Sequence, residues 1–417
     1  MADTLDELET RDPEARERDL MARLPQLVAR AQQAPGWARI LDGVDAAGVN
    51  SRDALAALPV TRKSELKALQ QAALPFGGLA ATAPSELRRV YVSPGPIYDP
   101  EGKGRDWWRF ARPMHAAGVR SGGLLQNCFS YHFTPAAFMV EGGAARIGCA
   151  VIPAGAGQTE MQVQAMADLR PDTYIGTPSF LRIIIEKARE MGADISSVKN
   201  ALMGAEALPE SLRAWFHANG VPKVLQTYAS ADIGSIAFET ESGGLVDAGM
   251  VVDEDVILEI VRPGTGEPVA PGDIGEIVVT LFNHDYPLIR FATGDMSALL
   301  TDAPAPGGRT NARIRGWLGR ADQTTKVRAM FVHPAQVANI VRRHPEILKA
   351  RLVVTGRMAN DVMTLHCEAA QPLSAERVAA IVASIRDVTK LRGEVALEAP
   401  GALPDDGKVI EDRRDYS

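Results

Sequence analysis

Side chains that could do chemistry stand in a series of short motifs in the second half of this 417-residue chain. Asp295 follows a Thr-Gly pair, and a carboxylate in such a place can accept charge-assisted hydrogen bonds from two neighbouring hydroxyl groups. Gly204 and Ala205 are small enough to let a flat ring approach the backbone. In a chain of net charge −7, Arg320 belongs to a local basic cluster that could hold phosphates, and the other members are Arg309, Arg313 and Arg315.

Two further motifs offer an acid and a lysine. Asp232 ends the run Tyr228-Ala229-Ser230-Ala231-Asp232 and supplies a hard oxygen ligand of the kind that Mg²⁺ prefers. Lys408 follows Gly407 close to the end of the chain. Each motif has an ordinary alternative: Thr-Gly-Asp occurs in turns, an acid can stabilise a helix N-terminus, and a lysine near a chain end is usually solvated.

In their order and spacing these motifs resemble the adenylate-forming enzymes, specifically the phenylacetate–CoA ligase branch. The resemblance extends over nearly the whole chain through Leu58–Lys63, Leu74–Gly77, Gln126-Asn127 with Tyr131, Ala150–Ala154, Gln158–Glu160 and Gly176–Ser179. It implies that a carboxylic acid, aromatic or arylacetic, is activated with ATP as an acyl-adenylate and then transferred to CoA. The cofactors implied are ATP, Mg²⁺ and CoA.

The resemblance also implies roles for single residues. Lys408 matches the lysine that bridges the carboxylate and the α-phosphate. Arg320 matches the arginine that contacts ribose and phosphate, and Asp322 matches the acid at the hinge. Asp232 matches the metal-binding acid. The nucleotide-binding positions are Ser93, Gly95, Gly204, Ala205, Glu206, Thr227, Tyr228, Ala229, Asp295 and Arg320. Candidate substrate-pocket residues are Tyr131, His132, Phe133, Phe138 and Thr177, and the aromatic ones among them could equally be core.

Three departures from the family pattern leave alternatives open. Ala329 replaces a glycine beside the thiol channel, which is consistent with an amide-forming or carrier-loading enzyme instead of a CoA ligase. The phosphate-binding loop contains three prolines, which remove backbone donors, and Asp99 and Glu101 would place negative charge near phosphates; the prolines are Pro94, Pro96 and Pro100. A nucleotide- or acyl-binding regulator without ATP turnover is therefore a further alternative.

Composition narrows the class of protein. Hydrophobic residues make up 46% of the chain, which predicts a packed core, and the acidic balance argues against nucleic acid as a partner. The N-terminus lacks a signal-peptide layout, and the uncharged run from Ser121 to Val140 contains too many polar groups to span a membrane, so we expect a cytoplasmic protein. Three cysteines without a CxxC pair indicate neither a disulfide framework nor a zinc site. A homodimer is one option for the assembly.

The hydrophobic pattern predicts how these residues are positioned. Between residues 123 and 228 short apolar strands alternate with helices, which predicts an α/β fold with a parallel sheet and a ligand site at the carboxyl ends of its strands. Strands at 256–261 and 276–281 then predict a hairpin-rich sub-region. We expect an N-terminal domain over residues 1–321 and a small mobile α+β lid over residues 322–417, with the hinge near Asp322.

Overall fold

The computed structural model describes residues 3–93, 96–206, 208–301, 306–323, 325–327, 330–356, 361–404 and 408–414. It divides into two compact units. The N-terminal unit consists of Met1–Thr293 and Ala298–Gly316, and the C-terminal unit consists of Gly294–Ser297 and Trp317–Ser417. The unit boundary at residue 316 falls close to the domain boundary predicted at residue 321. That predicted boundary, and the mobility of the second domain as a lid, stay predictions.

An eight-stranded sheet crosses the N-terminal unit in the order β16-β12-β9-β8-β7-β6-β4-β5. Five of its strands are parallel, as the alternating pattern predicts: β4 (Leu124–Asn127), β5 (Ala150–Ile152), β6 (Thr173–Gly176), β7 (Asn200–Met203) and β8 (Lys223–Ser230). The other three are antiparallel to their neighbours: β9 (Gly234–Phe238), β12 (Met250–Val252) and β16 (Arg313–Ile314).

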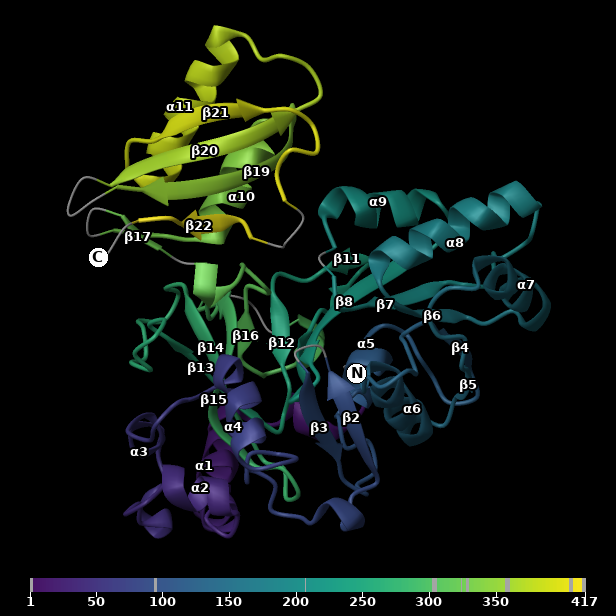
Figure 1. The fold of residues 1–417 in the computed structure, drawn as a ribbon. Helices are drawn as coiled ribbons and strands as arrows, with labels where there is room; N and C mark the ends of the chain where they lie inside the picture. Colours follow the sequence, from purple (N-terminus) through teal and green to yellow (C-terminus); the bar gives the residue numbers. More distant parts are fainter. Residues whose placement is uncertain are drawn as a thin grey trace. The chain divides into compact units, whose positions relative to one another are not determined.

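Helices cover both faces of the parallel strands (Figure 1). On one face Ile175 and Leu202 pack with the helices α5 and α6, while on the other Tyr174 and Met203 pack with α7, α8 and α9. Burial on both faces explains why apolar residues follow one another along these strands, as in Leu124-Leu125 and Ala201–Met203. The helices are α5 (Ala111–Ala116), α6 (Ala136–Ile147), α7 (Thr159–Leu169), α8 (Pro178–Met191) and α9 (Glu210–Ala218).

A second sheet has the strand order β1-β15-β14-β13. The predicted hairpin is present, because Val256 pairs with Leu281 and Val261 with Glu276 in antiparallel register. Its core is shared with the N-terminal helices, whose residues Leu24, Val28 and Trp37 are buried. The strands are β1 (Thr61–Arg62), β13 (Val256–Val261), β14 (Gly275–Leu281) and β15 (Leu288–Ser297), and the helices are α1 (Pro13–Ala31), α2 (Pro35–Ile40), α3 (Arg52–Ala56) and α4 (Leu66–Ala72).

Shorter elements connect these layers. The hairpin of β2 (Arg89–Ser93) and β3 (Ile97–Glu101) contains the loop at which the sequence departs from the phosphate-binding pattern. The remaining short elements of this unit are β10 (Glu241–Ser242), β11 (Leu245–Val246), η1 (Glu7–Thr10), η2 (Ala46–Gly48), η3 (Lys63–Glu65), η4 (Pro84–Glu86) and η5 (Pro306–Gly308). Within the described ranges, no helix is both long and apolar enough to cross a membrane.

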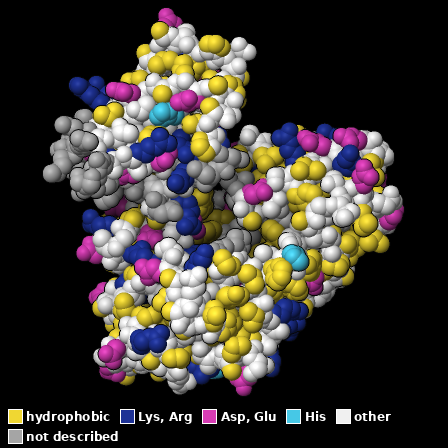
Figure 2. Space-filling view, viewed as in Figure 1, with side chains coloured by type: hydrophobic (Ala, Val, Ile, Leu, Met, Phe, Trp, Pro, Cys, Tyr) yellow, Lys and Arg dark blue, Asp and Glu magenta, His cyan; other side chains and the backbone are white. Residues whose placement is uncertain are grey.

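The C-terminal unit is a four-stranded sheet in the order β21-β20-β19-β22, with two helices packed against one another. Ile340, Leu352 and Ile381 lie in its core. Acidic and basic side chains are interspersed on its visible face (Figure 2). Within this unit, Arg351 and Arg413 both form ion pairs with Glu411. The elements are η6 (Ala321–Gln323), β17 (Thr325–Val327), β18 (Met330–Val332), α10 (Pro334–Arg343), β19 (Ile347–Thr355), β20 (Val362–Ala369), α11 (Ala375–Thr389), β21 (Glu394–Glu398) and β22 (Ile410–Asp412).

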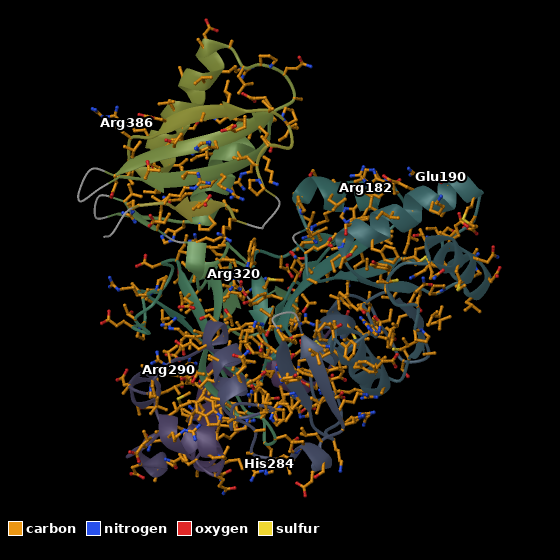
Figure 3. The ribbon with its side chains drawn as sticks, in the orientation of Figure 1. Arg182, Glu190, His284, Arg290, Arg320 and Arg386 are labelled. Atoms are coloured by element: carbon orange, nitrogen blue, oxygen red, sulfur yellow. The ribbon has the colours of Figure 1, made fainter. Side chains whose placement is uncertain are left out.

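Arg290 joins three parts of the N-terminal unit (Figure 3). Its guanidinium, in a residue only 2% exposed, donates to both oxygens of Glu259 at 3.0 and 3.1 Å. It also donates to the carbonyl oxygens of Ala56, Leu58 and Gly266 at 2.6–2.7 Å. Removing one partner of a buried ion pair leaves an uncompensated charge in the interior.

We therefore expect Arg290→Met to lower the free energy of unfolding by about 3–5 kcal/mol, because it leaves Glu259 buried without its cation. Chemical denaturation at neutral pH measures this change. Arg262→Met, which removes an exposed arginine of the same sheet region, is the control and should change the free energy of unfolding by less than about 0.5 kcal/mol. Equal stability of the two variants would contradict this role for Arg290.

Candidate active site

The carboxyl ends of β6, β7 and β8 bring together three of the predicted residues. Thr177 accepts a hydrogen bond from the backbone N–H of Phe180 at 3.4 Å and so caps helix α8. Gly204 directly follows β7, and a Cβ atom built there would lie 3.4 Å from the Phe129 ring and 3.5 Å from the Thr227 methyl group. A Cβ atom at this position would therefore make ordinary van der Waals contacts with both side chains.

The loop after Gly204 is fixed by its own side chains. Ala205 has a φ of 65°, a left-handed conformation that is strained for alanine. Glu206 accepts hydrogen bonds from the backbone N–H and the hydroxyl of Ser179 at 3.2 and 2.9 Å, and the Gln226 side chain donates to its carbonyl at 2.9 Å. The Glu206 carboxylate therefore lies at the N-terminus of α8, where the helix dipole favours negative charge.

Tyr228 connects the parallel sheet to β15. Its hydroxyl lies 3.4 Å from the hydroxyl of Thr293, which in turn donates to the carbonyl of Ile277 at 3.1 Å. The β8–β9 pairing shifts register between Tyr228 and Ala229, so the chain bends there. Both residues are half-buried, and Thr227 is buried.

In the C-terminal unit, Asp295 and Arg320 are paired. The Oδ1 atom of Asp295 accepts hydrogen bonds from Nη1 of Arg320 at 3.2 Å and from Nε1 of Trp317 at 3.0 Å. Gly294 has a φ of 77°, which favours glycine, and a Cβ atom there would lie 2.7 Å from the Arg320 guanidinium, which would have to shift. The structure thus joins two predicted motifs, and it adds Trp317, a half-exposed indole that no sequence signal marked.

The remaining residues with predicted catalytic roles are also in the C-terminal unit. Lys408 is exposed just before β22. Asp322 lies in the turn Ala321–Gln323, and its side chain is outside the described part of the structure. Gly95, Ala329 and Gly407 also lie outside the described residues.

The predicted basic cluster does not form as one group. Arg309 is buried in the N-terminal unit, where its side chain binds Glu9 at 2.6 Å and the carbonyl of Asp3 at 2.7 Å. Arg313 is buried and donates to the carbonyl of Gly249 at 3.1 Å. These arginines anchor the N-terminal segment and β12, so they are not available to hold phosphates, and the prediction for them is wrong.

The aromatic pocket candidates separate into two groups. The rings of Tyr131 and Tyr91 each lie 5.4 Å from the Phe138 ring, and the Tyr131 hydroxyl donates to Glu141 at 2.6 Å. This packing agrees with the alternative that Tyr131 and Phe138 are core residues. His132 and Phe133 instead lie on an exposed loop, where the Phe133 side chain is 62% exposed.

The β2–β3 hairpin turns its acids inward. Glu101 is 3% exposed and receives hydrogen bonds from Arg89 at 3.1 Å and from the Tyr91 hydroxyl. Asp99 is 1% exposed. The expectation that these acids place charge near phosphates is wrong, because strand pairing of Arg89 with Glu101 and of Tyr91 with Asp99 positions them in the interior. Ser93 is likewise buried.

Asp232 is buried in the same part of the N-terminal unit as Asp99. It is 1% exposed, and its Oδ2 atom lies 2.5 Å from Nζ of Lys63. Burial, and then the neighbouring charge of Asp232, raise the pKa of Asp99 to about 8. Strand β9 follows Asp232, so the helix N-terminus alternative is wrong.

Asp232 does not fit the predicted magnesium site. A nucleotide-facing Mg²⁺ ligand needs an oxygen within reach of solvent and substrate, whereas the Asp232 side chain is fully buried and bound to an ammonium group. Among the described residues, no group of three or more His, Cys, Asp or Glu side chains could hold a metal ion.

Comparisons with known proteins agree with these motifs. A family model described as AMP-binding enzyme matches residues 118–281. A phenylacetate–coenzyme A ligase from Thermus thermophilus is 31% identical over 368 residues, which are 85% of this chain and 81% of the relative. The chain belongs to the phenylacetate–CoA ligase family. The corresponding enzyme from Escherichia coli is 30% identical over 70% of this chain and 69% of the relative.

The fold is also similar to that of a solved structure. An open conformation of 2-hydroxyisobutyryl-CoA ligase, in complex with its acyl-AMP and CoA, aligns with a TM-score of 0.82 at 24% identity, covering 97% of this chain and 93% of that one. The predicted α/β fold class is therefore confirmed, and the predicted family is confirmed by the relatives of 30–31% identity.

Replacing the carboxylate of Asp295 tests its predicted role as the ribose ligand. Asp295→Asn should weaken binding of both ATP and AMP by about 1–3 kcal/mol, because a charged acceptor becomes neutral. Titration calorimetry measures both affinities. Asp273→Asn, at an exposed turn, is the matched control; unchanged affinity in Asp295→Asn would rule out the assignment.

The raised pKa of Asp99 gives a second prediction. Because the folded state holds this proton more tightly than the unfolded state, the free energy of unfolding should fall as pH rises from about 4 towards 8. Asp99→Asn should remove that part of the decline. The free energy of unfolding should therefore fall less between pH 5 and pH 8.5 in the variant than in wild type. Urea denaturation at the two pH values measures it. Parallel pH profiles of wild type and variant would contradict it.

Proposed function

We propose that this protein activates a carboxylic acid with ATP as an acyl-adenylate and then transfers the acyl group to CoA. The observation that carries the proposal is the Asp295–Arg320 pair, because it joins two motifs of the family, 25 residues apart in sequence, within hydrogen-bond distance. Family membership supports the same reaction class. The solved 2-hydroxyisobutyryl-CoA ligase holds both an acyl-AMP and CoA.

We propose an aromatic or arylacetic acid as the substrate. The support is that curated relatives at 28–31% identity are phenylacetate–CoA ligases. Phe129, a buried core residue, places the tip of its ring beside Gly204 at the strand ends. A small hydroxy acid is the alternative, since the structural neighbour is a ligase of that kind.

The reaction proceeds in two steps in this proposal. A carboxylate oxygen attacks the α-phosphorus in line, and the bond to pyrophosphate breaks. The thiolate of CoA then attacks the acyl carbonyl and AMP leaves. In the first step the ammonium of Lys408 neutralises charge shared by the carboxylate and the α-phosphate, while Asp295 and Arg320 hold the ribose. The Gly204–Glu206 loop and Tyr228 hold the adenine.

An ATP–pyrophosphate exchange screen over a panel of arylacetic, benzoic and short hydroxy acids tests the proposal. We expect exchange with at least one arylacetic acid and acyl-CoA formation when CoA is added. Asp295→Asn serves as the impaired control. Exchange without acyl-CoA formation would favour an amide-forming or carrier-loading enzyme. Nucleotide binding without exchange for any acid would favour a regulator, and both results would contradict the proposal.

Lys408→Ala separates the two steps. Loss of one charge-stabilising donor should lower the rate of adenylate formation by about 10²–10³. Thioester formation from a supplied acyl-adenylate should stay within a few-fold of wild type, because its transition state no longer includes pyrophosphate loss. Rapid-quench assays of each half-reaction measure this. Arg392→Ala, an exposed cation of the same unit, is the control. Equal loss in both half-reactions would contradict the role.

The hairpin predicts weak recognition of the outer phosphates. The backbone N–H of Val92 already donates to the carbonyl of Phe133 at 2.9 Å, and that of Tyr98 donates to the Gln70 side chain at 2.8 Å. Pro96 has no N–H to donate. We expect calorimetry to give an ATP affinity within about tenfold of the AMP affinity, since donors for the β- and γ-phosphates are few. An ATP preference that Lys103→Ala abolishes would show conventional recognition instead.

A further inference from the structure

A buried group of charged side chains lies where three distant segments of the N-terminal unit meet. Lys63 comes from the turn after β1, Asp99 from β3, and Asp232 from the turn between β8 and β9. Each of the two aspartates is 1% exposed, and the Lys63 ammonium lies 2.5 Å from Oδ2 of Asp232. The buried phenol of Tyr286 is close enough that both carboxylates raise its pKa, after burial as the main cause.

The charges of this group balance without a metal. Oδ1 of Asp232 and Oδ2 of Asp99 are buried and have no hydrogen-bond partner among the described residues. One proton on Asp99 satisfies both oxygens if it is donated to Asp232, and the raised pKa of Asp99 keeps that proton bound at neutral pH. The single negative charge of Asp232 then faces the single positive charge of Lys63.

A divalent cation at the same place would be unfavourable. Mg²⁺ takes near-octahedral coordination and keeps several waters, whereas the Asp232 side chain has no exposed surface. A second cation would also have to displace the ammonium or lie beside it in the interior, where charge repulsion is only weakly screened. The ammonium of Lys63 therefore already provides the positive charge that the acid requires.

We propose that Lys63 is the permanent cation of Asp232, and that the Tyr228–Asp232 turn does not ligate a divalent metal in this protein. The ion pair instead fixes this turn to β1 and to the hairpin strand β3. Lys63 is thereby a positioning residue for Tyr228, four residues before Asp232. The inference relies on the proposed function only where adenylate formation is used as a readout.

A double-mutant cycle tests the ion pair. Lys63→Met and Asp232→Asn should each lower the midpoint of thermal unfolding by at least about 5 °C, because the first leaves the buried Asp232 carboxylate without its cation and the second leaves the partly buried Lys63 ammonium without its anion. The double variant should lose less than the sum of the two, and Lys63→Arg should lose less than Lys63→Met. Additive losses would overturn the pairing.

Metal titration tests the second half of the proposal. Mn²⁺ is the probe, and its binding to nucleotide-free protein is followed by electron paramagnetic resonance. Wild type and the double variant Lys63→Met/Asp232→Asn should give the same isotherm. A stoichiometric Mn²⁺ site in wild type that the double variant lacks would overturn the proposal.

The Mg²⁺ dependence of adenylate formation separates the two roles of Asp232, because it changes if Asp232 binds the metal and stays the same if Asp232 only supports the structure. At saturating ATP, the free Mg²⁺ concentration for half-maximal rate should be the same within about twofold for wild type and Asp232→Asn, whereas loss of a true ligand raises it by about tenfold or more. If no acid supports adenylate formation, the proposed function fails, but the unfolding and Mn²⁺ experiments still decide the role of Lys63.

Discussion

The buried guanidinium of Arg290 is the interaction on which the rest of the site depends. It fixes β15 against Glu259 on β13 and against the loop that leads to β1. β1 pairs with β15 in parallel, Thr61 with Phe291, so the same strand sets the position of Lys63. β15 then continues through Thr293, which contacts Tyr228, to Asp295. Within the N-terminal unit, one strand therefore connects the half-buried Lys63 and Tyr228.

The regular elements could be predicted from local sequence. β13 matches the expected range 256–261 because a two-residue period is a signal within a few residues. The environment of Asp99 and Glu101 could not be predicted in this way. Their side chains turn inward because β2 pairs with β3, and the prolines around them concealed that strand. The partner of Arg309 is Glu9, 300 residues earlier in the chain, which no local pattern could show.

The sequence predicted the main residues of the site but not the side chains that contact them. The motifs identified Asp295 and Arg320, and these are paired in the structure. The contacts of Trp317 and Lys63 could not be predicted, because a tryptophan before Gly-Arg and a lysine after Thr-Arg have no distinctive spacing. Asp232 was found as an acid, but whether a carboxylate binds a metal or an ammonium depends on which distant side chain reaches it.

The attachment of Glu206 to the start of α8 has a consequence for how ligands are selected. A loop that is already held by Ser179 and Gln226 has little conformational freedom left to lose when a ring enters beside Gly204. Such preorganisation favours fast and selective association over adaptable binding. In the proposed binding mode, with the adenine beside Gly204, a base with a larger exocyclic group is rejected by steric exclusion at a rigid edge, instead of being accommodated by movement of the loop.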